Sequence, residues 1–132
     1  QYAFESIKNS LWEGYGLDKY AYLDKALVPV HLRSLIIGAH NGYLAILTQL
    51  GIVFGSMVLF IIFRTCYNLF YLFYQKEGSE RLYVFIIIYT LFAAIYESLI
   101  VGINEFHTIL FWLSLVILSF LKFKKLDEDS SN

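Results

Sequence analysis

Four side chains of this apolar sequence are of types that could form a catalytic or binding site: Arg33, His40, Asn41 and Glu97. Because histidine titrates near neutral pH, His40 could take a proton from an attacking hydroxyl or carry a positive charge. Arg33 stays charged and can hold phosphate oxygens with two parallel hydrogen bonds. Asn41 could orient His40, cap a following helix, or do both. These residue types favour a site that binds an anion and activates a hydroxyl group.

Glu97 falls about one turn from the end of an apolar segment. It shares a helical face with Thr90 and Ala94, so we expect it to point into a helix bundle. Ionisable groups inside membrane-spanning helices are costly and are functional candidates by default. The structural alternatives stay open: Glu97 could reach water, His40 could be hydrogen-bonded among lipid headgroups, and Arg33 could be held by lipid.

Several other chemistries lack their sequence signals. His31, His40 and His107 come from separate segments without close ligand spacing, so we expect no metal site. There is no glycine-rich phosphate loop, GxSxG or CxxC motif, and we expect no cofactor. No basic stretch suggests nucleic acid. With Cys66 as the single cysteine, an intrachain disulfide is impossible.

The composition indicates a membrane protein. Of the 132 residues, 58% are hydrophobic and 19% aromatic, whereas soluble domains are about 45–50% apolar. We therefore predict an all-α, polytopic membrane protein. The sequence begins with Gln1 inside a polar, aromatic stretch, and we expect it to be the C-terminal part of a longer chain. Missing N-terminal helices of the same chain would then supply most of the bundle.

Residues 1–41 read as an outer loop segment with short amphipathic helices. Phe4, Ile7, Leu11 and Trp12 recur at helical spacing. The Gly-Tyr-Gly sequence of residues 14–16 should end that helix in a turn. A second short helix is expected around 20–23, where tyrosines suit the membrane interface.

Three apolar segments, at about 42–63, 82–101 and 106–121, are predicted to span a membrane. About 20 helical residues rising 1.5 Å each cross a hydrocarbon core of about 30 Å. Arg64 marks the end of the first segment, and 76–81 is a polar connection. The charged tail, 122–132, is expected to be disordered.

The helical period places His40, Leu44, Thr48, Gly51 and Gly55 within an arc of about 80°. Gly51 and Gly55 form a small-xxx-small pair, which lets another helix approach closely. We therefore expect His40 at the top of a face that packs into the bundle.

Lysine and arginine residues give the orientation. They occur in 64–81 and again in 122–125, but not in the hairpin at 102–105. The positive-inside rule puts the first two in the cytoplasm, so 1–41 and 102–105 face outward. The candidate site residues then collect at the outer face.

The stretch Ala39-His40-Asn41-Gly42-Tyr43-Leu44, followed by Leu47, Leu50-Gly51 and Gly55, resembles the His-Asn-containing signature of the O-antigen ligase and polymerase superfamily. In that family the signature opens the helix after a large periplasmic loop, and 14–16 is similar to a Gly-x-Gly element of the loop. A loop, a signature helix, a short cytoplasmic connection and two closing helices match the family's C-terminal third. The resemblance thus covers most of the chain.

The resemblance implies a multi-pass bacterial inner-membrane enzyme with a largely helical glycosyltransferase C-type fold, active at the periplasmic face without metal or cofactor. Its partners would be membrane lipid, an undecaprenyl-pyrophosphate-linked glycan, and an acceptor glycan (polymerases) or lipid A core sugar (ligases). His40 would act as base or pyrophosphate ligand. Arg33 would correspond loosely to a family periplasmic arginine, and Asn41 and Glu97 would help bind substrate.

Two other classes of protein remain open at this point. A transporter or flippase would use His40 and Glu97 as a proton relay. A non-catalytic membrane subunit would use the seam of Gly51 and Gly55 to bind a partner.

Overall fold

The computed structural model describes residues 2–16, 30, 40–76, 78–102 and 105–130. These residues form four α-helices and no strand: α1 (Tyr2–Asn9), α2 (Gly42–Phe73), α3 (Ser79–Ala93) and α4 (Phe106–Ser130). The prediction of an all-helical chain is thereby confirmed. Arg33, His31 and the short helix expected around 20–23 lie outside the described residues.

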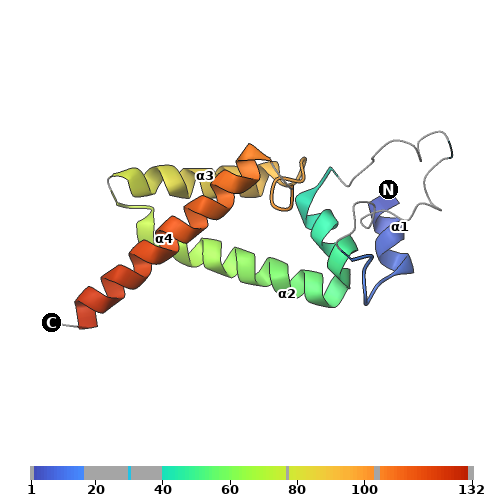
Figure 1. Ribbon diagram of the computed structural model, residues 1–132, viewed down its shortest axis with the longest axis horizontal. Coiled ribbons are helices and arrows are strands. Elements are labelled where there is room, and N and C mark those ends of the chain that lie inside the picture. Colours follow the sequence, from blue (N-terminus) through green and yellow to red (C-terminus); the bar gives the residue numbers. More distant parts are fainter. Residues whose placement is uncertain (1, 17–29, 31–39, 77, 103–104, 131–132) are drawn as a thin grey trace.

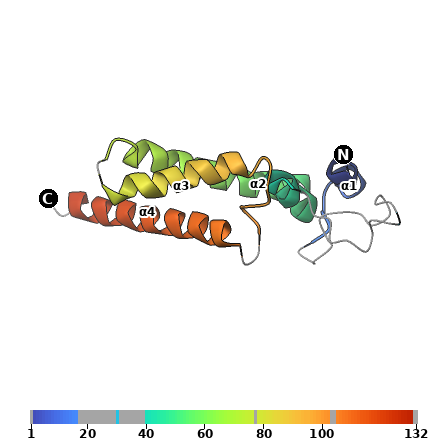
Figure 2. The same ribbon diagram turned by 90° about the horizontal axis from the view of Figure 1, so that it is seen from above.

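α2 and α4 run in broadly the same direction, and α3 runs back in the opposite direction (Figures 1 and 2). In Figure 1, α4 crosses α3 and α2 obliquely. α1 packs against the first part of α2, at the end of the molecule away from the α2–α3 connection. The core between α2, α3 and α4 is apolar, with Leu69, Ile87, Phe111 and Leu118 among its buried side chains. The chain is therefore a helical hairpin extended by a third helix.

Two described helices are long and apolar enough to cross a membrane: Gly42–Phe73 and the Phe106–Asp127 part of α4. Only 28% of the most apolar stretch of each is buried, whereas the core helix of a soluble protein is mostly buried. Large side chains such as Phe60, Phe92 and Phe120 are about two-thirds exposed. Apolar surface this extensive suits contact with lipid or with other protein.

α2 is broken at Gly51, whose φ of 73° and ψ of 173° are not helical. Its first turns leave the rest of the helix at a steep angle (Figure 1). Backbone bonds from segment 11–16 fill the break: Tyr15 N–H donates to the Thr48 carbonyl at 3.0 Å, and Ile52 N–H to the Leu11 carbonyl at 2.8 Å. The polar groups freed by the break are thus satisfied by an upstream segment.

Gly51 and Gly55 of α2 do not form a seam for another helix, so that prediction is wrong. A Cβ on Gly51 would overlap the Trp12 carbonyl, and one on Gly55 would lie 3.0 Å from Leu47 Cα in the first part of α2 itself. The absence of a side chain at Gly51 permits the break in α2, and at Gly55 it lets the two parts of α2 pack closely beside the break. The continuous face expected from His40 to Gly55 does not exist either, because the helix begins at Gly42 and is interrupted at Gly51.

Some helix ends differ from the sequence prediction. α3 has 15 residues and ends at Ala93, and 94–101 form turns, although an apolar segment extends to 101. α4 begins at Phe106, as expected, but continues to Ser130. Residues 122–130 are therefore helical instead of disordered, because lysine, leucine and glutamate are good helix formers that extend an existing helix.

α1 uses only part of the predicted amphipathic face. Ala3, Ser6 and Ile7 are buried, but Phe4 is exposed. The helix ends at Asn9, so Leu11 and Trp12 lie beyond it. The expected turn follows, with positive φ at Gly14 and Gly16.

Candidate functional site

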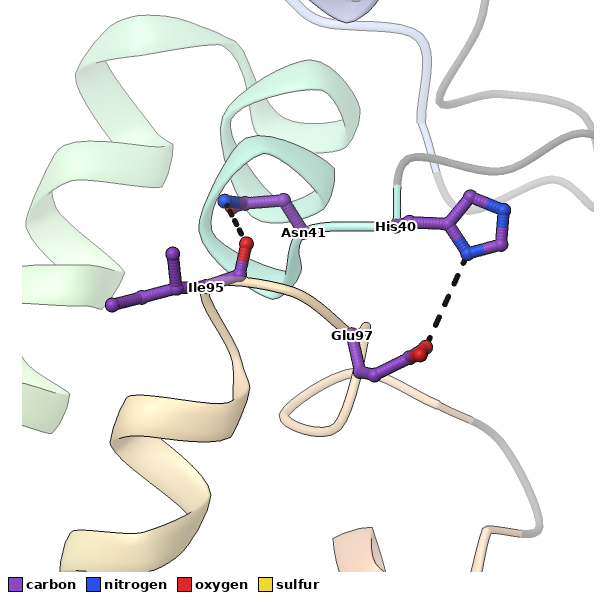
Figure 3. A network of polar contacts seen from close by, with 4 residues as sticks. All are labelled: His40, Asn41, Ile95 and Glu97. Carbon is purple, nitrogen blue, oxygen red and sulfur yellow. Dashed lines mark hydrogen bonds and ion pairs between the residues drawn. The ribbon is translucent and has the colours of Figure 1, made fainter.

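Asn41 joins the beginning of α2 to the end of α3. Its side-chain oxygen accepts a hydrogen bond from Leu44 N–H at 2.9 Å, which makes it the N-cap of α2. Its side-chain nitrogen donates to the Ile95 carbonyl at 2.7 Å (Figure 3). The capping role considered from the sequence is present, and the second bond holds the adjacent His40 beside the end of α3.

The next two residues reinforce this junction. Gly42 N–H donates to the Ala94 carbonyl at 2.8 Å and to the Glu97 carbonyl at 3.1 Å, and the Tyr43 hydroxyl donates to the Leu91 carbonyl. The last carbonyls of a helix lack partners within the helix. The beginning of α2 therefore supplies partners for the carbonyl end of α3.

α4 donates hydrogen bonds to two carbonyls of the turn that follows α3. The Thr108 hydroxyl donates to the Leu99 carbonyl at 2.6 Å, and the Trp112 indole donates to the Ile100 carbonyl at 3.2 Å. Non-helical backbone at membrane depth is tolerated only when its polar groups have such partners. The sequence analysis did not identify the role of Tyr43, Thr108 and Trp112 in this junction. The available signal was that each carries a hydrogen-bond donor near the beginning of an apolar segment.

The junction brings His40 and Glu97 together. His40 Nδ1 lies 4.0 Å from Glu97 Oε2, and the two side chains are 83% and 63% exposed (Figure 3). Both come from non-helical backbone, one just before α2 and the other just after α3. They form an ion pair when the imidazole is protonated.

Two orientation predictions are wrong. His40 does not top a packing face, because it precedes the first helical residue and its side chain is exposed. Glu97 does not point into the bundle with Thr90 and Ala94; those two are buried, but α3 ends before Glu97 and the chain turns it outward. Both predictions assumed that the residue belongs to the neighbouring helix, whereas His40 lies before α2 and Glu97 lies after α3.

The described part of the site contains the Glu97 carboxylate, the carbonyl end of α3 and the N–H end of α2. The helix dipoles place partial negative charge at the end of α3 and partial positive charge at the beginning of α2. The predicted cation, Arg33, lies outside the described residues. Glu105 folds toward Gly102, and His107 packs edge-on to Phe106 at 6.1 Å between ring centroids. Within the described ranges, no three His, Cys, Asp or Glu residues are close enough to hold a metal ion.

In comparisons with known proteins, no protein-family model, no curated protein and no solved structure matches this chain.

Proposed function

We propose that this protein is a membrane-bound glycosyltransferase of the O-antigen ligase and polymerase class. It would move a glycan from undecaprenyl pyrophosphate to an acceptor sugar at the outer face of the bacterial inner membrane. The observation that carries the proposal is the exposed His40–Glu97 pair, 4.0 Å apart, at the ends of apolar helices. An imidazole supported by a carboxylate is a recurrent arrangement for proton transfer from a hydroxyl.

The directions of α2, α3 and α4 support three membrane crossings. α2 and α4 have broadly the same direction, and α3 runs back in the opposite direction (Figure 1). If both α2 and α4 cross, the chain must cross back between them. The 15 residues of α3 cover about 22 Å at 1.5 Å each, and the turns at 94–101 complete the passage. We propose that these crossings belong to a glycosyltransferase C-type fold.

In the proposed reaction, His40 acts as the general base. It takes the proton of the acceptor hydroxyl while that oxygen forms a bond to the anomeric carbon of the donor glycan. The bond from the anomeric carbon to the pyrophosphate oxygen breaks, and the lipid pyrophosphate leaves with the electron pair. Glu97 stabilises the imidazolium that this transfer creates.

The position of Glu97 favours the base role of His40 over the role of anion ligand. A carboxylate 4.0 Å away stabilises an imidazolium but repels a pyrophosphate approaching the same group. The pyrophosphate therefore needs other cations, and Arg33 is the candidate within this chain.

The geometry gives less support to the two other classes of protein. A proton relay for transport needs ionisable groups within the spanning helices, whereas His40 and Glu97 lie outside α2 and α3 and are exposed. A glycine seam that binds a partner is disfavoured, because Gly51 and Gly55 are already occupied by this chain's own atoms.

The test is transfer activity of the whole protein in membranes, with lipid-linked glycan as donor and matched variants. His40→Ala should lower the rate by about 10²–10⁴-fold, the usual contribution of a general base. Glu97→Gln should lower it by a smaller factor. His107→Ala and Glu105→Gln are the controls, since Glu105 lies just before α4, His107 lies in its first turn, and both side chains are exposed. Both variants should keep wild-type rates.

Normal transfer by correctly inserted His40→Ala protein would refute the catalytic role. Equal losses in His40→Ala and His107→Ala would point to a general effect of histidine removal at this surface. Loss of pH-dependent uptake in Glu97→Gln, with transfer unaffected, would favour the transporter.

A further inference from the structure

A groove follows the seam between α2 and α3. It consists of two cavities of about 290 and 250 Å³ that share Phe70 and Ile88 as lining residues. On the α2 side it extends from Phe63 to Tyr74, a rise of 11 helical steps or about 16 Å at 1.5 Å per step. That is close to half of a hydrocarbon core of about 30 Å, the thickness of one leaflet.

The lining is apolar except at one end. The larger cavity is lined by aliphatic and aromatic side chains together with Cys66. The smaller one adds Arg81 and the hydroxyl-bearing Tyr74. At the same end, Lys76 Nζ lies 5.7 Å from the centroid of the Phe73 ring. The groove therefore combines an apolar channel with a cationic mouth.

Arg81 is exposed, and among the described residues it has no carboxylate partner. Its neighbour Glu80 extends its carboxylate toward Gly78. A guanidinium beside an apolar groove suits a ligand with a phosphate at one end and a hydrocarbon chain at the other.

The opposite end of the groove is occupied by Tyr43. Its ring stacks on Phe63 with centroids 5.5 Å apart, and its hydroxyl bonds to the Leu91 carbonyl. Phe63 and Leu91 both line the larger cavity. A hydrocarbon chain lying in the groove therefore ends at Tyr43 and continues toward Arg81, away from His40.

We propose that this groove binds an anionic phospholipid from the leaflet at the α2–α3 connection. The phosphate lies at Arg81, and one acyl chain extends between α2 and α3 toward Phe63. Charge complementarity selects an anionic lipid over a zwitterionic one, because Arg81 lines the groove and no carboxylate is among the lining residues of the two cavities. The proposal rests on membrane insertion, and it is independent of the transferase activity.

The test measures lipid retained by the whole protein after purification in a neutral detergent, with phosphatidylglycerol and phosphatidylcholine as probes in native mass spectrometry. Wild-type protein should retain severalfold more phosphatidylglycerol. Arg81→Gln should reduce that retention about tenfold, and Ile88→Trp, which fills the point shared by the two cavities, should also reduce it. Lys122→Gln is the matched control, because this lysine on α4 lines neither cavity, and retention should be unchanged.

Equal retention of the two lipids by wild-type protein would overturn the proposal, and this comparison depends on no variant. So would an equal loss in Lys122→Gln and Arg81→Gln, which would indicate general surface charge. Undiminished binding in Ile88→Trp would place the lipid elsewhere. His40→Ala should retain phosphatidylglycerol normally, so failure of the transferase proposal and failure of the lipid proposal give different results.

Discussion

At the scale of residues, the His-Asn-Gly-Tyr sequence has a structural role that can be separated from its chemistry. Asn41, Gly42 and Tyr43 all bond to carbonyls at the end of α3, and Asn41 also caps α2. Only His40 is left with its side chain exposed beside Glu97. Asn41, Gly42 and Tyr43 therefore form the junction between α2 and α3, and the junction holds His40 at the surface.

Substitutions of Asn41 should separate its two bonds. Asn41→Ala removes the cap and the bond to Ile95 and should lower the free energy of unfolding by about 1–2 kcal/mol. Asn41→Ser keeps a good N-cap but does not reach Ile95, so its loss should be smaller. The measurement is thermal unfolding in detergent.

Asn68→Ala is the control, since Asn68 is exposed on α2 without a partner among the described residues. It should unfold at the wild-type temperature. An Asn41→Ser variant as stable as wild type would show that the bond to Ile95 contributes nothing.

At the scale of elements, the break in α2 decides where the site lies. It allows the first turns of α2 to run at a steep angle to the rest (Figure 1), which brings Gly42 against Ala94. A continuous helix would carry residue 42 away along the axis of α2. The junction with α3 thus depends on the break, and the break depends on segment 11–16.

Glycine substitutions test the break. Gly51→Ala places a Cβ at positive φ, a strain of about 1–3 kcal/mol, and also overlaps the Trp12 carbonyl. Gly16→Ala introduces strain alone, because nothing lies within 4 Å of the added Cβ. Gly51→Ala should therefore lose more stability, and its segment 11–16 should be cleaved faster by protease. If Gly51→Ala matched wild type in both measurements, α2 would be continuous at this position.

At the scale of the whole molecule, the His40–Glu97 site lies at one end of the bundle. The segments that carry lysine and arginine, at 64–81 and 122–125, lie toward the other end. α1, the beginning of α2 and the end of α3 are at one end, while the α2–α3 connection and the end of α4 are at the other (Figures 1 and 2). The His40–Glu97 pair lies where α2 begins and α3 ends. The orientation that we propose, with the site facing outward, needs such a separation.

Cysteine labelling tests this orientation. In intact cells, Glu13→Cys should react with a membrane-impermeant thiol reagent, and Ser79→Cys should react only after lysis. Native Cys66 is 4% exposed and should give little background. Reaction of Ser79→Cys from outside intact cells would reverse the orientation.

The sequence by itself determined the helical class, the apolar segments, the N-cap at Asn41 and the glycine turn at 14–16. These features depend on side chains within a few residues of one another: an amide that reaches a nearby N–H, or glycines that permit positive φ. The beginnings of α2 and α4 were predictable for the same reason.

Only the tertiary structure decided the break at Gly51, the end of α3 and the meeting of His40 with Glu97. Each depends on hydrogen bonds between distant segments, such as that from Asn41 to Ile95, 54 residues further along the chain. The apolar sequence continues unchanged through Gly51 and past Ala93, so local pattern favours continued helix there. Partners from elsewhere in the chain stabilise the interrupted backbone instead, and they set which polar side chains remain exposed.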